Sequence, residues 1–221
     1  MGRAREIADL IGGTTPDIIL KTSDGAILNL QTSDTTVAAD GVLGAINFQA
    51  PDEASGTDSI LIASKIEAVA EGTFSASSNA TSLVFSTASS AAAGTVSGKM
   101  TFTSGGNLII KDTDTADGSS PTITLQSGDT DIAADDVLGS INFQAPDEGT
   151  GTDAILVAAG IEAVSEGDFS SSSNATKLVF KTGSSEAATE KMSLSSDGEL
   201  TLTSSTASRP GFTMENTNAD A

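Results

Sequence analysis

Apolar side chains recur at every second position over much of this chain, which is the spacing of a β-strand with one buried face. Ile46 and Phe48 alternate with polar neighbours, and Ile141 and Phe143 repeat the same alternation. No long stretch shows a clear helical spacing of three or four. The pattern therefore predicts an all-β protein built from short antiparallel strands.

Turn signals separate these strands. The strings KMTFTSGGNLII and KMSLSSDGELTL each hold two apolar runs around a glycine-containing turn, at Gly105-Gly106 and at Asp197-Gly198. Such residues tolerate the positive φ of tight hairpin turns. Just upstream, residues 83–85 and 178–180 are short apolar runs that suit buried strands. We therefore expect two β-hairpins, each preceded by a buried strand.

Two segments, residues 59–71 and 154–166, are ambiguous. Each could form a helix that begins at an aspartate and ends at a glycine cap. Their β-branched content and the glycine at position 160 favour a strand. As a strand, each would be apolar on both faces at its start, which suits burial between its own sheet and a neighbouring subunit.

The chain contains an internal repeat. Residues 41–85 match residues 136–180 at 33 of 45 positions without a gap, an offset of 136 − 41 = 95 residues. A copied module of this size is typical of an array in which units stack to build length. The repeat predicts an N-terminal docking segment, two β-repeats, and the start of a third repeat or an assembly tail: 1–15, 16–110, 111–203 and 204–221.

Polar linkers that end in Pro16, Pro121 and Pro210 punctuate the chain. Proline biases the residue before it toward extended geometry, so each linker should lead into a strand. After Pro16, Asp24-Gly25 suits a hairpin turn. The residues after Pro210 resemble the opening of a third unit, so either the gene product continues or a partner completes this edge.

The first residues differ from the rest. Residues 4–11 can form a short helix that carries its apolar side chains, Ile7, Leu10 and Ile11, on one side and ends at a glycine pair. Such a helix could be an attachment segment, or part of a helical bundle at one end of a fibre. A loose terminus would give the same pattern.

Composition excludes several functions. The net charge of −20 disfavours partners such as nucleic acid and anionic membrane surfaces, which attract cationic proteins. The chain lacks His, Cys, Trp and Tyr, so it has no imidazole base, no thiolate and few platforms for stacking bases or sugars. No run of 18 apolar residues exists, so we expect no membrane insertion.

Candidate chemistry is sparse. Asp112, Asp114 and Asp117 superficially resemble a calcium loop, but the third carboxylate is displaced by one position and position 123 is Ile instead of the required Glu. A solvated linker is the simpler interpretation. Adjacent carboxylates such as Asp52 and Glu53 point in opposite directions on an extended chain and make poor acid–base pairs. We therefore predict no enzymatic activity and no cofactor or structural metal.

Small side chains dominate, so one module alone has difficulty burying enough apolar surface to offset its conformational entropy. We expect partner subunits to supply the missing core in an obligate homo-oligomer. The residues expected at this shared core or subunit interface are the β-branched and aromatic positions of the repeat: Ile46, Phe48, Ile66, Phe85, Ile141, Phe143, Ile161 and Phe180.

The strings VLGSINFQAPDE, ILVAAGIEAVSEGDF, KLVFKTG and EKMSLSSDGELTL, with their counterparts in the first copy, resemble repeats in tail-fibre and appendage proteins of tailed, especially marine, bacteriophages. The resemblance covers roughly residues 16–203. It implies a β-rich homotrimeric shaft, attached to the virion and its other tail proteins at the N-terminus, with regions that bind a host surface glycan or protein farther along. No self-cleaving chaperone region is apparent, which favours the shaft role over direct receptor recognition.

We therefore expect an all-β protein of tandem antiparallel modules, sheet-, sandwich- or prism-like, in an elongated trimeric fibre of the virion. Two other classes remain open. One is a cell-surface filament or adhesin whose subunits share terminal strands. The other is a spike that degrades a host polymer.

Overall fold

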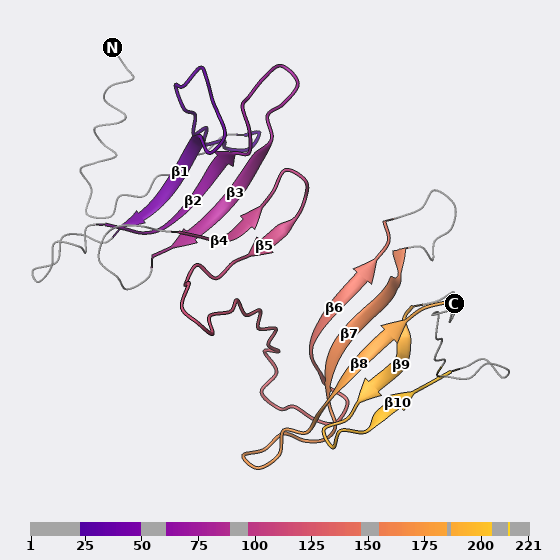
Figure 1. Cartoon of the computed structure of the whole chain (residues 1–221). Helices are drawn as coiled ribbons and strands as arrows, with labels where there is room; N and C mark the ends of the chain where they lie inside the picture. Colours follow the sequence, from indigo (N-terminus) through magenta and orange to yellow (C-terminus); the bar gives the residue numbers. More distant parts are fainter. Residues whose placement is uncertain are drawn as a thin grey trace, which may run out of the picture. The chain divides into compact units, whose positions relative to one another are not determined.

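The computed structural model describes residues 23–49, 61–88, 97–146, 155–184, 187–204 and 212. The chain divides into two compact units, residues 1–122 and 123–221, and each holds one antiparallel five-stranded sheet (Figure 1). The predicted N-terminal helix and its residues Ile7, Leu10 and Ile11 lie outside the described residues. None of the residues described forms a helix long and apolar enough to cross a membrane.

The first sheet runs in sequence order, so every strand pairs with its neighbour along the chain. Its strands are β1 (Val42–Gln49), β2 (Ile62–Ala70), β3 (Thr81–Thr87), β4 (Ser97–Phe102) and β5 (Leu108–Ile110). The second sheet repeats this meander with β6 (Val137–Gln144), β7 (Val157–Ser165), β8 (Thr176–Thr182), β9 (Thr189–Leu194) and β10 (Leu200–Leu202). The all-β prediction is confirmed, and each unit is a single sheet within the described residues, not a sandwich.

The two ambiguous segments are strands. β2 and β7 occupy the centre of the stretches that could also have formed helices, and each pairs on both sides. Their β-branched residues fit a pleated surface better than a helix, where χ1 is restricted by the preceding turn. The strand interpretation is therefore confirmed.

The two predicted hairpins are also present. Gly106 has φ 78° and Gly198 has φ 83°, and each lies in the turn that joins β4 to β5 or β9 to β10. Two backbone N–H···O bonds of 3.0 Å close each hairpin: Thr103 to Asn107 and Gly106 to Thr103 in the first, and Ser195 to Glu199 and Gly198 to Ser195 in the second. These turns fix the register of the last two strands of each sheet.

Irregularities of the first strand recur in both units. β1 is shifted in register between Val42 and Gly44 and again between Phe48 and Gln49, and β6 carries both shifts at the equivalent residues. Just before each strand an aspartate has positive φ, 66° at Asp40 and 69° at Asp135. Aspartate is one of the few residues other than glycine that tolerates this conformation. The outer edges of β1 and β6 are therefore bent at the same places.

The residues that lead into each sheet differ from expectation. Residues 26–31 and 123–126 have the alternating pattern of a strand, yet neither stretch belongs to a strand. Among the described residues, no hydrogen bond of any kind is made by residues 26–31 or 123–126. The pattern predicted a strand, but no neighbouring strand pairs with either stretch in the part of the chain that the structure describes.

Candidate assembly interface

The faces of the first sheet have opposite chemistry. One face, which we call the apolar face, carries a continuous cross-strand row that passes through all five strands in register: Ile46, Ile66, Phe85, Met100 and Ile110. A parallel row beside it consists of Gly44, Ala68, Leu83, Phe102 and Leu108. The rings of Phe85 and Phe102 meet edge to face, with centroids 6.2 Å apart and planes at 74°.

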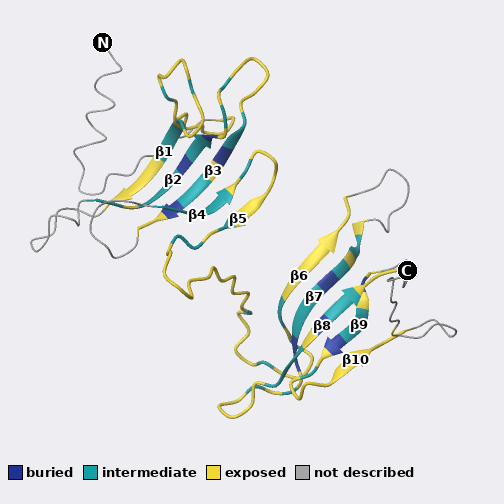
Figure 2. Ribbon diagram, viewed as in Figure 1, coloured by how far each residue is buried: buried dark blue, intermediate teal, exposed yellow. Residues whose placement is uncertain are grey.

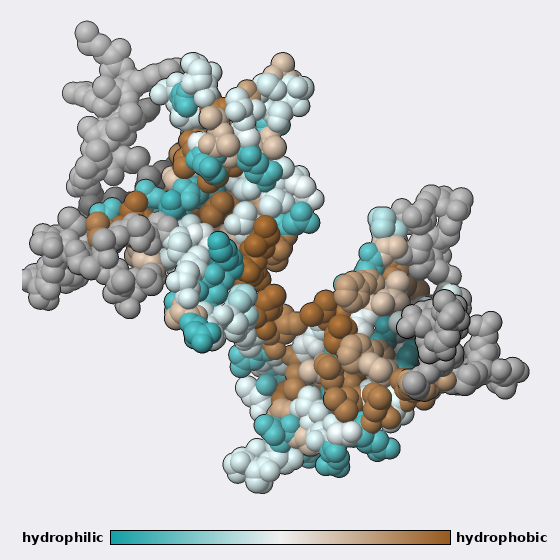
Figure 3. All heavy atoms as spheres, viewed as in Figure 1, coloured by the Kyte–Doolittle hydropathy of each residue, from teal (hydrophilic) through white to brown (hydrophobic). Residues whose placement is uncertain are grey.

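The second sheet has the same two rows. Its main row is Ile141, Ile161, Phe180, Met192 and Leu202. Its second row is Gly139, Ala163, Leu178, Leu194 and Leu200. Figure 3 shows apolar residues gathered over the visible side of this sheet. Both units therefore present one apolar surface of the same design.

This apolar face is largely uncovered in the single chain. Phe48 is 51% exposed and Phe143 is 56% exposed, whereas Ser86 on the opposite face is only 2% exposed. The buried residues of the opposite faces include the polar or charged Glu67, Ser82 and Ser193, together with Val179. A soluble monomer buries its large apolar side chains and exposes its charges. The exposed phenylalanines of the apolar faces and the buried Glu67 depart from that distribution.

The eight residues predicted at the interface all lie on the apolar faces. Four of them are half-buried, and they are the central residues Ile66, Phe85, Ile161 and Phe180. The other four are exposed, and they lie in β1 and β6: Ile46, Phe48, Ile141 and Phe143. Figure 2 shows that, among the strands, those at the sheet edges carry the most exposed residues. Their burial by a partner subunit remains a prediction.

Sequence reasoning did not include several members of the rows. Leu83, Met100 and Phe102 extend the apolar face of the first sheet, and Leu178, Met192 and Leu194 do so in the second. The predicted hairpins offered the signal that could have found them. A turn at Gly105-Gly106 sets Met100 opposite Ile110, and the alternation of β4 then places Phe102 on the same face.

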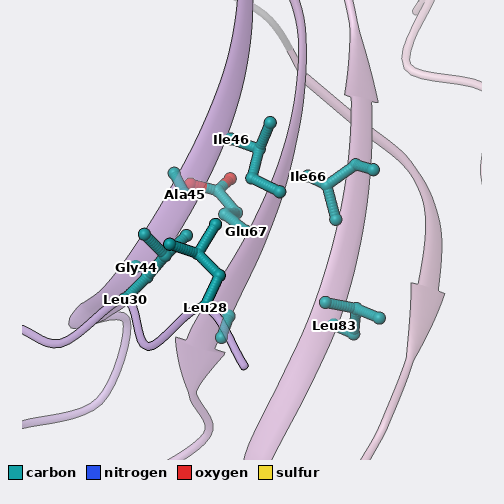
Figure 4. A pocket seen from close by; sticks show the side chains of 9 residues that line it. Leu28, Leu30, Gly44, Ala45, Ile46, Ile66, Glu67 and Leu83 are labelled. Atoms are coloured by element: carbon teal, nitrogen blue, oxygen red, sulfur yellow. The ribbon is translucent and has the colours of Figure 1, made fainter. Parts of the chain in front are cut away.

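A shallow hollow lies at the β1 side of the apolar face of the first sheet (Figure 4). Its volume is about 260 Å³, and its apolar lining comes from Leu28, Leu30, Ile46, Ile66 and Leu83. Leu30 crosses β1 at Gly44, where a Cβ would lie 2.7 Å from the Leu30 Cβ. The second unit repeats the crossing, with Leu125 2.8 Å from a Cβ built on Gly139. Glycine at these positions lets the leading segment pass close to the sheet.

The opposite face, which we call the polar face, carries ion pairs. Lys65 and Glu67 lie 2.7 Å apart on β2, and Lys181 of β8 lies 2.8 Å from Glu162 of β7. A longer pair of 3.6 Å joins Lys177 to Glu190. Each of these six charged side chains therefore has a partner of opposite sign on the same face.

A glutamate at the end of β2 anchors the β4–β5 hairpin. Glu71 accepts hydrogen bonds from the Ser104 N–H at 2.7 Å, from the Ser82 hydroxyl at 2.6 Å and from the Ser104 hydroxyl. These donors, the Ser104 hydroxyl first, lower the pKa of Glu71 below its usual range. In the second unit, Ser196 lowers the pKa of Glu166 through its hydroxyl and its N–H, the latter at 3.0 Å.

The three aspartates that resemble a calcium loop are engaged in local turns. Asp112 Oδ1 accepts the N–H of Asp114 at 2.9 Å, and Asp114 Oδ1 accepts the N–H of Ala116 at 2.9 Å. Among the residues that the structure describes, no group of three or more acidic side chains is arranged to hold a metal ion. The structure therefore does not bring Asp112, Asp114 and Asp117 together as a ligand set.

Comparison with known proteins gives only distant similarity. No family model and no curated protein matches the chain. A solved structure of the carboxy-terminal domain of the bacteriophage T5 L-shaped tail fibre with its intramolecular chaperone domain is 12% identical, with a TM-score of 0.41, and the match covers 93% of this chain and 68% of that one. A structure of the same carboxy-terminal domain matches at 11% identity and a TM-score of 0.38, covering 92% of this chain and 96% of that one.

Proposed function

We propose that this chain is a structural subunit of the shaft of a bacteriophage tail fibre or appendage, which holds host-binding parts at a distance from the virion. One observation carries the proposal: each sheet of the repeat leaves a wide apolar face uncovered in the single chain. Exposed apolar surfaces of this extent are typical of protein interfaces. The internal repeat then supplies length, because each unit adds another apolar face of the same kind along the chain.

Three copies are the association that this face best fits. A single sheet has an apolar face on one side only, and three such faces around a common axis enclose a continuous core while the polar faces remain in water. The ion pairs of the polar face, Lys65 with Glu67 and Lys181 with Glu162, suit such an outer surface. Both units present matching rows, so each could associate in this way with its counterparts in other copies.

The role of such a shaft is mechanical. It sets the distance and orientation of the parts at its tip, and threefold symmetry lets several weak contacts act together with high avidity. Attachment to other tail proteins through residues 1–15 and a location in the virion belong to the same proposal. Neither a catalytic step nor a cofactor has a place in it.

Mass in solution tests the proposal directly. Sedimentation equilibrium of the full chain, which has a mass of 22.0 kDa, should give one species of three times that mass down to micromolar concentration. Open-ended polymers that grow with concentration would instead support the cell-surface filament, whose subunits share terminal strands. A compact monomer with a cooperative melting transition would overturn both.

A carboxylate placed on the apolar face tests the same proposal, and a carboxylate placed on the polar face is its matched control. Ile66→Glu and Ile161→Glu should each dissociate the assembly, since an unpaired carboxylate would be buried at the axis. Asn47→Glu places the same carboxylate on the polar face, directly opposite Lys65, and it should leave the trimer mass unchanged. Equal effects of Ile66→Glu and Asn47→Glu on the mass would contradict the assignment of faces.

A further inference from the structure

Each unit contains both a strand-like segment without a partner and a sheet edge without a neighbour. Residues 26–31 and 123–126 alternate apolar and polar side chains, lie outside the assigned strands and make no hydrogen bond among the described residues. At the other side of each sheet, among the strands that the structure describes, β5 pairs only with β4 and β10 only with β9. We propose that the leading segment of one copy of the chain adds as a sixth strand to the free edge of β5 or β10 in the next copy.

The sequence of the leading segment suits this position. Leu28 and Leu30 alternate with Asn29 and Gln31, so a strand formed here has one apolar and one polar side. Placed beside β5 with its leucines next to Leu108 and Ile110, it extends the apolar rows of the sheet by one strand. In the second unit, Ile123 and Leu125 alternate with Thr124 and Gln126 in the same way.

β5 and β10 are better acceptors than the opposite edges. They are short, free of register shifts, and apolar, and Leu108 and Leu200 are among the exposed hydrophobic residues. β1 and β6 carry two register shifts each, and such bulges bend an edge strand and disrupt further pairing. The proposal therefore assigns β5 and β10 as the acceptor edges and gives β1 and β6 no added strand.

The positions of donor and acceptor also predict a closed ring. The donor crosses the sheet at Gly44 on β1, and the acceptor β5 is at the far side of β2, β3 and β4. An interface between opposite edges of the same unit is heterologous, and it closes into a ring when the rotation between copies allows. The inference rests on the proposed trimer and says how its copies are joined. In each unit, the leading segment of one copy pairs with the free edge strand, β5 or β10, of the next copy.

Engineered cysteines test this pairing, because the natural chain contains none. Asn29→Cys with Ile109→Cys places one thiol on the polar side of the donor and one on the polar side of the acceptor. Within one chain these positions are separated by four strand spacings, about 19 Å, which no disulfide can span. Any bond that forms must therefore join two copies.

Oxidation of the assembled variant with oxidised glutathione should yield covalent trimers, seen on a denaturing gel without reductant. Thr124→Cys with Thr201→Cys should do the same in the second unit. The matched controls pair the donor with the bulged edge, Asn29→Cys with Asn47→Cys and Thr124→Cys with Asn142→Cys, and these should yield no covalent trimer. A second pair, Gln31→Cys with Ile109→Cys, would form the cross-link if the donor strand is shifted along β5 by two residues.

Hydrogen exchange of the natural chain provides the measurement that needs no variant. In the assembly, amides of residues 26–31 and 123–126 should exchange at least about 100-fold more slowly than an unpaired chain. Residues 112–118, which form only local turns, are the internal control and should exchange rapidly.

The outcomes separate this inference from the proposed function. A trimer that shows rapid exchange in residues 26–31 and no cross-link at either register would overturn the strand addition while the trimeric shaft stands. Covalent trimers from the control pairs would also overturn it, since the donor would then lie along the bulged edge. A monomeric natural chain would overturn both.

Discussion

In strands β1 to β3 and their counterparts β6 to β8, the two units differ more on the polar face than on the apolar face. On the apolar face, Ile46, Phe48, Ile66 and Phe85 have identical counterparts 95 residues later, at the same register positions. On the polar face, several equivalent positions have changed their chemistry. This difference is what the proposed subunit interface predicts, because side chains that pack against a partner tolerate fewer changes than side chains in water.

The ion pairs illustrate how the polar face changes. Glu67 and Glu162 are equivalent, yet Glu67 is paired with Lys65 on its own strand, whereas Glu162 is paired with Lys181 on the neighbouring strand. The residue equivalent to Lys65 is Gly160, and the residue equivalent to Lys181 is Ser86. The equivalent glutamates are therefore paired with lysines from different strands, β2 in the first unit and β8 in the second. The glutamate, which is half-buried or buried in both units, retains a cation by either route.

A second difference between the units lies beside the glutamate that anchors each hairpin. Ser82 donates to Glu71 in the first unit, and Lys177 stands at the equivalent place in the second, where it pairs with Glu190. Glu166, the counterpart of Glu71, consequently retains Ser196 as its hydrogen-bond donor, with Lys177 as a nearby cation. The hairpin anchor is kept in both units while its surroundings differ.

The largest expected effect comes from the shared face. Phe85→Ala and Phe180→Ala should each destabilise the assembly by about 3–5 kcal/mol, the cost of truncating a fully buried ring. Urea unfolding at several protein concentrations measures this change. Thr101→Ala, on the polar face of the same sheet, is the control and should change stability by less than about 1 kcal/mol. If Phe85→Ala were as mild as the control, the ring would be exposed in the assembly too.

An intermediate effect should come from transplanting the ion pair of the first unit into the second. Lys181→Ser alone removes the cation beside Glu162 and should cost about 1 kcal/mol. Adding Gly160→Lys recreates the arrangement of Lys65 and Glu67, and it should restore most of that loss. A Cβ at position 160 would lie 3.0 Å from Asn142 Oδ1, a side chain that can shift, and 3.3 Å from the backbone oxygen of Ile141, so β6 must also move by a few tenths of an ångström.

A double-mutant cycle with the single variant Gly160→Lys isolates the coupling from the change in strand propensity. Additive effects of the two substitutions would show that the pairs are not interchangeable. In that case the difference between the units would have another cause than the exchange of lysines.

The smallest effect concerns the hairpin anchors and pH. The pKa values of Glu71 and Glu166 are lowered in the folded chain, so their contribution to stability is complete above the unfolded value of about 4.3 and is lost as the pH falls through the folded value. Glu71→Gln should therefore reduce the fall in melting temperature between pH 6 and pH 3. Glu166→Gln should do so less, because Ser196 alone supplies its hydrogen bonds. An unchanged acid dependence in Glu71→Gln would contradict the anchor.

Much of the fold could be predicted because its signals are local. Alternation gave the strands, and the glycine turns gave both hairpins, since φ at Gly106 and Gly198 is a property of four adjacent residues. The choice between helix and strand for β2 and β7 also followed from local residue preferences.

The long-range contacts could not be predicted in the same way. The bond from Ser104 to Glu71 joins residues 33 positions apart, and its formation depends on where the β4–β5 turn folds back. The choice of partner for Glu162 depends on sheet register, which a pattern of alternation alone does not fix. For residues 26–31 the alternating pattern indicated a strand, but pairing is a property of two segments, and no pairing segment is found among the described residues.

The meander order of each sheet has a kinetic consequence. Every strand pairs with its sequence neighbour, so all ladder contacts close short loops, and such topologies form rapidly. Each sheet should therefore fold early, during synthesis of the chain, while its apolar face is still exposed to water. The slow step is then the encounter of separate chains, whose rate rises with their concentration. A dilute newly made chain would linger in that state, where proteases and aggregation compete with its partners.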